Sequence, residues 1–179
     1  MERVVLQTVI HAPPSAIYPV LANFERYPRY ATHLEWVEPR GEGPAGPQYD
    51  LHLSWWRISH TTRSEIVERD PPHRLGWRLT RDVEARGAWE LEERPELAPA
   101  DAETATRVTF EGRADPTTAE TGNLSLPGLL PMDVVIAKAR PIVKREVRET
   151  VRRLVADVEG HPREVELSLE HESVAPSDN

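Results

Sequence analysis

The sequence predicts an α+β protein in which an antiparallel sheet of six or seven strands wraps around one long C-terminal helix. Apolar and polar residues alternate in successive short segments between residues 49 and 113, which is typical of half-buried strands. Turn residues such as Asp70-Pro71-Pro72 separate these segments, and consecutive strands joined by short turns form antiparallel meanders. From about Leu130 to Glu159 the apolar residues instead recur every three or four positions, which indicates an amphipathic helix. The 179 residues suffice for one domain with a sizeable core.

The first elements are a strand and two short helices. Residues Val4 to Ile10 are rich in β-branched side chains, which strands favour. Pro13-Pro14 suits the first turn of a helix, where a missing N–H costs nothing. The run that follows places four apolar side chains on one helical face, namely Ile17, Val20, Leu21 and Phe24. The segment ERYPRY then leads into an apolar patch formed by Leu34, Trp36 and Val37.

Five alternating segments form the predicted meander. A loop rich in glycine and proline, residues 41–48, precedes them. Its glycines spell G-x-G-x-x-G, but Pro44 and Pro47 interrupt the motif and a strand follows it, so we expect a hairpin and no nucleotide site. Longer polar loops are expected at 94–104 and 114–128. The strands are expected at residues 49–55, 60–68, 74–80, 85–93 and 105–113.

The long helix has a strong stop signal, because Gly160 is followed by Pro162. Pro141 lies inside the helix and is expected to kink it or to split it into two segments. The domain is therefore assigned to residues 1–160. Residues 161–179 form an acidic tail in which Val165, Leu167 and Leu169 alternate weakly. An added edge strand and a frayed end both remain open for this tail.

The alternation places most of the large side chains of the meander on one face, toward the helix. Ser64 brings a hydroxyl to that face, and Arg57 follows Trp55 at the same parity. We expect a mostly apolar cavity there, open near the loops at 41–48 and 114–128. The alternative is a solid core with Arg57 at its rim. The expected ligand-binding residues are Tyr49, Leu51, Leu53, Trp55, Arg57, Ser64, Ile66, Trp77, Trp89, Phe110, Met132 and Ile142.

The order strand, Ala-Pro-Pro, helix, Asn-Phe-Glu-x-Tyr-Pro-x-Tyr resembles the opening of the START-like superfamily. That superfamily includes polyketide cyclases/dehydrases, lipid-transfer domains and coenzyme Q-binding proteins. The phrases Asp-Pro-Pro-His-Arg-Leu-Gly-Trp at 70–77 and Leu-Pro-Met-Asp at 130–133 are also similar to family patterns. The resemblance implies a helix-grip fold, in which the sheet and the long helix enclose one hydrophobic pocket.

The composition excludes several kinds of site and partner. The chain has no cysteine, so disulfides and thiol catalysis are excluded, and its seven histidines show no metal-ligand spacing. A net charge of −8 argues against nucleic acid as a partner. No apolar run reaches the roughly 20 residues that span a bilayer, so we expect no stable membrane insertion. Without a recognisable signal peptide, a cytoplasmic location is expected.

Three functions remain open. The first is a carrier or sensor that binds a hydrophobic small molecule such as a lipid, quinone, isoprenoid or polyketide-like compound. The second is an enzyme of the polyketide cyclase/dehydrase type that uses the same cavity, and the third is a protein-interaction module. No acid–base pair is evident on the inward face, which favours binding over catalysis. No cofactor or catalytic residue is assigned, and the oligomeric state is left open.

Overall fold

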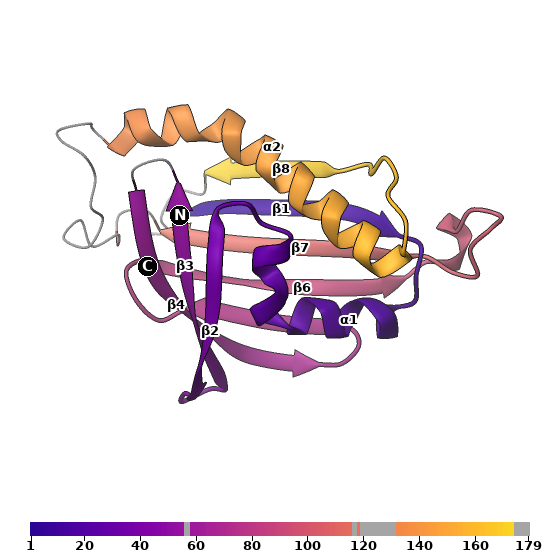
Figure 1. The fold of residues 1–179 in the computed structure, drawn as a ribbon, viewed down its shortest axis with the longest axis horizontal. Helices are drawn as coiled ribbons and strands as arrows, with labels where there is room; N and C mark the ends of the chain where they lie inside the picture. Colours follow the sequence, from indigo (N-terminus) through magenta and orange to yellow (C-terminus); the bar gives the residue numbers. More distant parts are fainter. Residues whose placement is uncertain (56–57, 116–117, 119–131, 174–179) are drawn as a thin grey trace.

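The computed structural model describes residues 1–55, 58–115, 118 and 132–173, without the side chains of residues 55, 58, 132–144 and 173. Eight strands and two α-helices make up the described chain (Figure 1). The strands are β1 Glu2–Ile10, β2 Leu34–Glu42, β3 Pro47–Trp55, β4 Ile58–Asp70, β5 Arg74–Leu79, β6 Glu84–Glu93, β7 Thr106–Asp115 and β8 Ser168–Ser173. The helices are α1 Pro14–Ala22 and α2 Met132–Glu159, with 3₁₀ turns η1 Phe24–Arg29 and η2 Pro95–Leu97.

All eight strands form one antiparallel sheet in the order β2-β3-β4-β5-β6-β7-β1-β8. The first strand pairs with β7 and so extends the meander at its edge, as predicted. The count of six or seven strands was too low, because β2 was expected only as an apolar patch. Of its nine residues only Leu34 is buried, and register shifts accompany Pro39 and Gly41, so the strand lacks a clean alternation.

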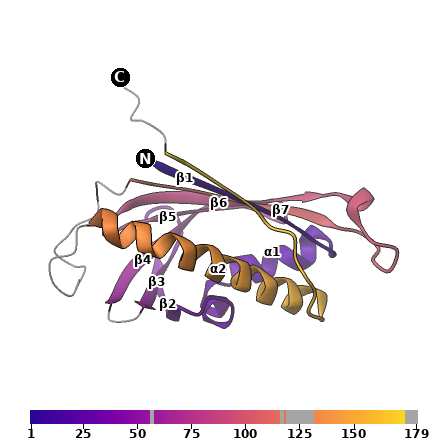
Figure 2. The ribbon, with the colours of Figure 1, turned by 90° about the horizontal axis from the view of Figure 1, so that it is seen from above.

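The helices lie on one side of the sheet, which curves around them (Figure 2). The apolar face of α1 buries Ile17 and Leu21 completely, and the last turns of α2 add Val155. These side chains pack against residues of β1 and of β4 to β7: Ile10, Ile66, Leu75, Leu91 and Val108. This packing places the core at the end of the sheet where α1 and the C-terminal half of α2 meet.

Helix α2 is continuous from Met132 to Glu159, so Pro141 does not split it into two segments. The alternative, a bend at Pro141, stays a prediction. In the tail, β8 pairs with β1 from Glu2↔Ser173 to Gln7↔Ser168 and forms the outer edge of the sheet.

Candidate ligand-binding site

Three aromatic rings from neighbouring strands meet on the concave face of the sheet. Trp77 on β5 and Phe110 on β7 have nearly parallel rings, with centroids 6.0 Å apart and planes at 8°. Trp89 on β6 is tilted against Phe110 at 4.7 Å. All three are half-buried, so part of each ring remains accessible. The predicted inward parity of these residues agrees with this arrangement.

Two glycines that face each other across β6 and β7 make room for these rings. Gly87 pairs with Gly112, and Trp77 pairs with Gly87 on the other side. A Cβ atom at Gly87 would lie 2.8 Å from the Trp77 indole and 2.3 Å from the carbonyl oxygen of Glu111. A Cβ atom at Gly112 would lie 3.1 Å from the Phe110 ring. The rings of Trp77 and Phe110 therefore occupy space that a side chain at position 87 or 112 would otherwise fill.

A second aromatic group lies beside the first. Phe24 contacts Tyr27 at 4.8 Å and Tyr49 at 5.2 Å between ring centroids. The Tyr27 hydroxyl donates to the carbonyl oxygen of Leu21 at 2.6 Å. Burial raises the pKa of Tyr27, and a hydrogen bond with Trp89 acts in the opposite direction. This tyrosine thus ties the residues after α1 to the strand residues of the aromatic face.

The remaining predicted site residues lie in different surroundings. By register, Leu51 and Leu53 lie opposite Thr62 and His60, and Leu53 is 42% exposed. Ser64 and Ile66 are each 2% exposed, and Ile66 belongs to the packed core. Arg57 and the side chains of Trp55, Met132 and Ile142 lie outside the described residues.

The hairpin between β2 and β3 lies on the convex face, away from this surface. Gly43 N–H donates to Gly46 O at 2.7 Å, which confirms a hairpin at the G-x-G-x-x-G segment. Ala45 N–H donates to Glu65 Oε1 at 3.1 Å, and Glu65 is on the convex side of β4 and fully buried. The expected cavity opening near 41–48 is therefore wrong. The other expected opening, near the loop at 114–128, lies outside the described residues, apart from Ala114, Asp115 and Thr118.

Buried carboxylates on the convex face are engaged by arginines. Asp50 is 1% exposed, although the alternation of its strand predicted that its side chain would lie on the solvent-exposed face of the sheet. Arg63 Nε donates to Asp50 Oδ1 at 2.7 Å, and Arg40 Nε donates to Oδ2 at 2.5 Å. These arginines lower the pKa of Asp50 to about 2, Arg63 having the larger effect. The guanidinium groups cover the carboxylate, which explains its burial and gives this cluster a structural role.

The structure contains an acid–base pair that no sequence pattern predicted. His60 Nε2 on β4 lies 3.2 Å from Asp82 Oδ2, which comes from the turn between β5 and β6. Both side chains are largely buried, at 16% and 15% exposure. Register places His60 on the same face as Leu53, so the pair lies at the edge of the concave surface. Twenty-one residues separate His60 and Asp82 in the sequence, so no short motif contains both. The folding of the meander brings them together.

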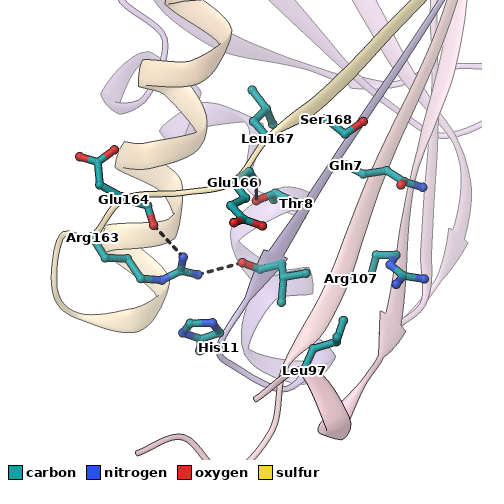
Figure 3. Close-up of a pocket in the computed structure, with 11 residues that line it drawn as sticks. Gln7, Thr8, His11, Leu97, Arg107, Arg163, Glu164, Glu166, Leu167 and Ser168 are labelled. Carbon is teal, nitrogen blue, oxygen red and sulfur yellow. Dashed lines mark hydrogen bonds between the residues drawn. The ribbon is translucent and has the colours of Figure 1, made fainter. Parts of the chain in front are cut away.

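A separate surface pocket of about 760 Å³ lies between β1, η2 and the segment before β8 (Figure 3). Polar side chains that line this pocket form hydrogen bonds and ion pairs with other residues of the chain. Arg163 Nη2 donates to Val9 O at 2.8 Å and also pairs with Glu159. Thr8 Oγ1 donates to Glu166 O at 2.9 Å. These contacts hold the C-terminal segment against β1, so we assign this pocket a structural role.

The described residues carry neither a metal-binding cluster nor a membrane-spanning helix. No group of three or more histidine, aspartate or glutamate side chains there could hold a metal ion. No helix in that part of the chain is long and apolar enough to cross a bilayer.

An antiparallel sheet curved around a long C-terminal helix defines a protein of the helix-grip fold. Residues 1–159 match the family described as polyketide cyclase / dehydrase and lipid transport, and the chain belongs to this family. A search of the curated proteins finds no match.

Solved structures share the fold at low sequence identity. The chain is similar to the Zhui aromatase/cyclase from Streptomyces sp. R1128, with 19% identity, a TM-score of 0.58, and coverage of 89% of this chain and 94% of that one. It is also similar to a START superfamily protein from Mycobacterium smegmatis, with 14% identity, a TM-score of 0.59, and coverage of 89% and 99%. These similarities establish the helix-grip architecture.

Proposed function

We propose that this protein binds a hydrophobic small molecule, as a carrier or sensor, on the concave face of its sheet. The observation that carries the proposal is the half-buried cluster of Trp77, Trp89 and Phe110 over the facing glycines Gly87 and Gly112. The half-buried rings present broad, flat apolar surface on this face of the sheet. Such a surface suits a planar or chain-like apolar ligand such as a quinone, isoprenoid, lipid or polyketide-like compound.

Apolar contact alone gives weak binding. A ligand that loses ~300 Å² of apolar surface gains about 7 kcal/mol at ~25 cal/mol/Å². Association costs at least ~4 kcal/mol of lost translational and rotational freedom. The remaining ~3 kcal/mol corresponds to a dissociation constant weaker than ~1 mM. A polar group must therefore add affinity and fix the orientation of the ligand.

A cyclase/dehydrase-type enzyme is the second candidate, and the His60–Asp82 pair favours it. A titratable pair at the edge of an apolar surface is an arrangement that general acid–base catalysis uses. Binding was favoured over catalysis from the sequence because no such pair was evident there. The pair removes that objection, while the surrounding apolar surface supports both candidates equally.

Native mass spectrometry of the purified full-length protein tests the proposal. We expect a bound species whose mass matches a lipophilic compound recovered by organic extraction of the same sample. A protein of bare-chain mass that also fails to take up added quinones, fatty acids and aromatic polyketides would contradict it.

A further inference from the structure

A notch at the edge of β4 brings together polar side chains from both faces of the sheet. Pairing between β4 and β5 ends at Ser64 and Leu79. Beyond this point the β5–β6 turn leaves an opening of about 470 Å³ beside β4. It is lined by His52, Ser59, His60, Thr61, Thr80, Arg81 and Asp82.

The β5–β6 turn holds Asp82 in an unusual backbone conformation. Asp82 has a φ of 75°, in a region that few residues other than glycine adopt. Val83 N–H donates to Arg81 O at 2.9 Å, so Asp82 is the central residue of a three-residue turn. Strained conformations of this kind are frequent at functional sites. Here the turn places the Asp82 carboxylate 3.2 Å from His60.

The second imidazole nitrogen of His60 is an acceptor that the pair leaves open. Asp82 Oδ2 is buried and makes no hydrogen bond of good geometry with the described residues, so His60 Nε2 is its electrostatic partner. The 3.2 Å contact with the Asp82 carboxylate favours the tautomer that carries its hydrogen on Nε2, in which Nδ1 is an acceptor. His60 makes no further polar contact within the described part of the chain. Its Nδ1 is thus available to a ligand.

Two further side chains of the lining, Arg81 and His52, have partners within the chain. Arg81 Nη2 pairs with Asp50 at 3.5 Å. The His52 ring bonds to Thr61 and Ser59, stacks on Trp36, and lies 3.6 Å from Glu35. Beside His60, the carboxylate of Asp82 would repel a permanent anion. A neutral group that carries a dissociable proton fits better.

An apolar surface adjoins this acceptor. Leu53 lies directly opposite His60 in the β3–β4 register and is 42% exposed. Leu51, two residues along β3, points to the same face and is half-buried. A ligand with its apolar body on these leucines would place a polar end beside His60.

We propose that His60, held by Asp82, accepts the hydroxyl proton of a phenol or enol whose apolar body lies on Leu51 and Leu53. The O–H bond breaks, the electron pair stays on the ligand oxygen, and the proton forms an N–H bond at Nδ1. Asp82 balances the charge of the resulting imidazolium, and the proton returns to the ligand on release. This assignment rests on the proposed function and names its ligand class as apolar compounds with an acidic hydroxyl.

Two matched probes test it on the full chain: 4-nitrophenol, whose phenolate has a distinct visible absorption band, and 4-nitroanisole, which has no hydroxyl proton. Below the pH at which free 4-nitrophenol ionises, the wild-type protein is expected to produce the phenolate band on binding. His60→Gln should reduce that band at least tenfold while 4-nitroanisole binds equally to both proteins. Asp82→Asn, which tolerates a positive φ, should also reduce the band without a change in circular dichroism.

The outcomes separate the two proposals. Binding of both probes without a phenolate band, or with a band that survives His60→Gln, overturns the role of His60 and leaves the hydrophobic site standing. Failure of both probes to bind the wild-type protein, at concentrations up to their solubility, overturns this assignment and counts against the proposed function as well.

Discussion

Gly87 lies beneath the indole ring of Trp77, so that any side chain at position 87 would meet both the ring and the backbone of β7. The register explains this contact, because Gly87 is paired with Trp77 on one side and with Gly112 on the other. The aromatic surface therefore depends on two glycines in strands, where glycine is otherwise unfavourable.

Gly87→Ala should destabilise the fold by about 1–3 kcal/mol, because the methyl group overpacks the sheet against Trp77 and Glu111 O. Urea unfolding measures the free-energy change. Gly112→Ala is the matched control and should cost less, since its nearest contact is the Phe110 ring at 3.1 Å. Equal stability of wild type and Gly87→Ala would show that the ring does not lie where we describe it.

Asp50 should make stability depend on pH in acid. Its folded-state pKa of about 2 is below the ordinary value of 3.8, so the unfolded chain takes up this proton first as the pH falls. The stabilisation is complete above about pH 4 and is lost toward about pH 2, amounting to roughly 2 kcal/mol. Urea unfolding at a series of pH values should show this loss in the wild type and a shallower change in Asp50→Asn. Other carboxylates titrate in both proteins, so parallel pH curves would contradict the pairing.

The acidic tail is proposed to lie outside the domain of residues 1–160. A chain ending at Glu164 keeps the Arg163–Glu159 pair but lacks β8. We expect it to fold, as judged by circular dichroism, and to self-associate more strongly because the edge of β1 is exposed. Light scattering measures the association. Loss of the folded spectrum would instead make the tail part of the domain.

Trp89→Ala should weaken binding of an apolar ligand by at least tenfold and reduce stability by roughly 3–5 kcal/mol. Trp36→Ala is the control of the same residue type, because Trp36 stacks on His52 on the convex face and is 40% exposed. Isothermal titration at a temperature where both variants are folded compares the affinities. An equal loss in both variants would remove Trp89 from the site.

The strand pattern predicted the aromatic face because Trp77, Trp89 and Phe110 obey the two-residue period of strands. It failed for β2, whose exposed residues give no alternation, and for Asp50, whose burial depends on arginines from β2 and β4. The His60–Asp82 pair was out of reach for a different reason. It depends on one turn with a positive φ and on where the β4–β5 pairing ends, and neither leaves a periodic signal in the sequence.

The central claim is that the concave face binds a hydrophobic molecule, and titration of tryptophan fluorescence with a hydrophobic quinone tests it most directly. We predict saturable quenching with a stoichiometry of about one per chain, retained in Trp36→Ala and weakened in Trp89→Ala. Quenching that rises linearly with quinone concentration, without saturation and alike in all three proteins, would contradict the claim.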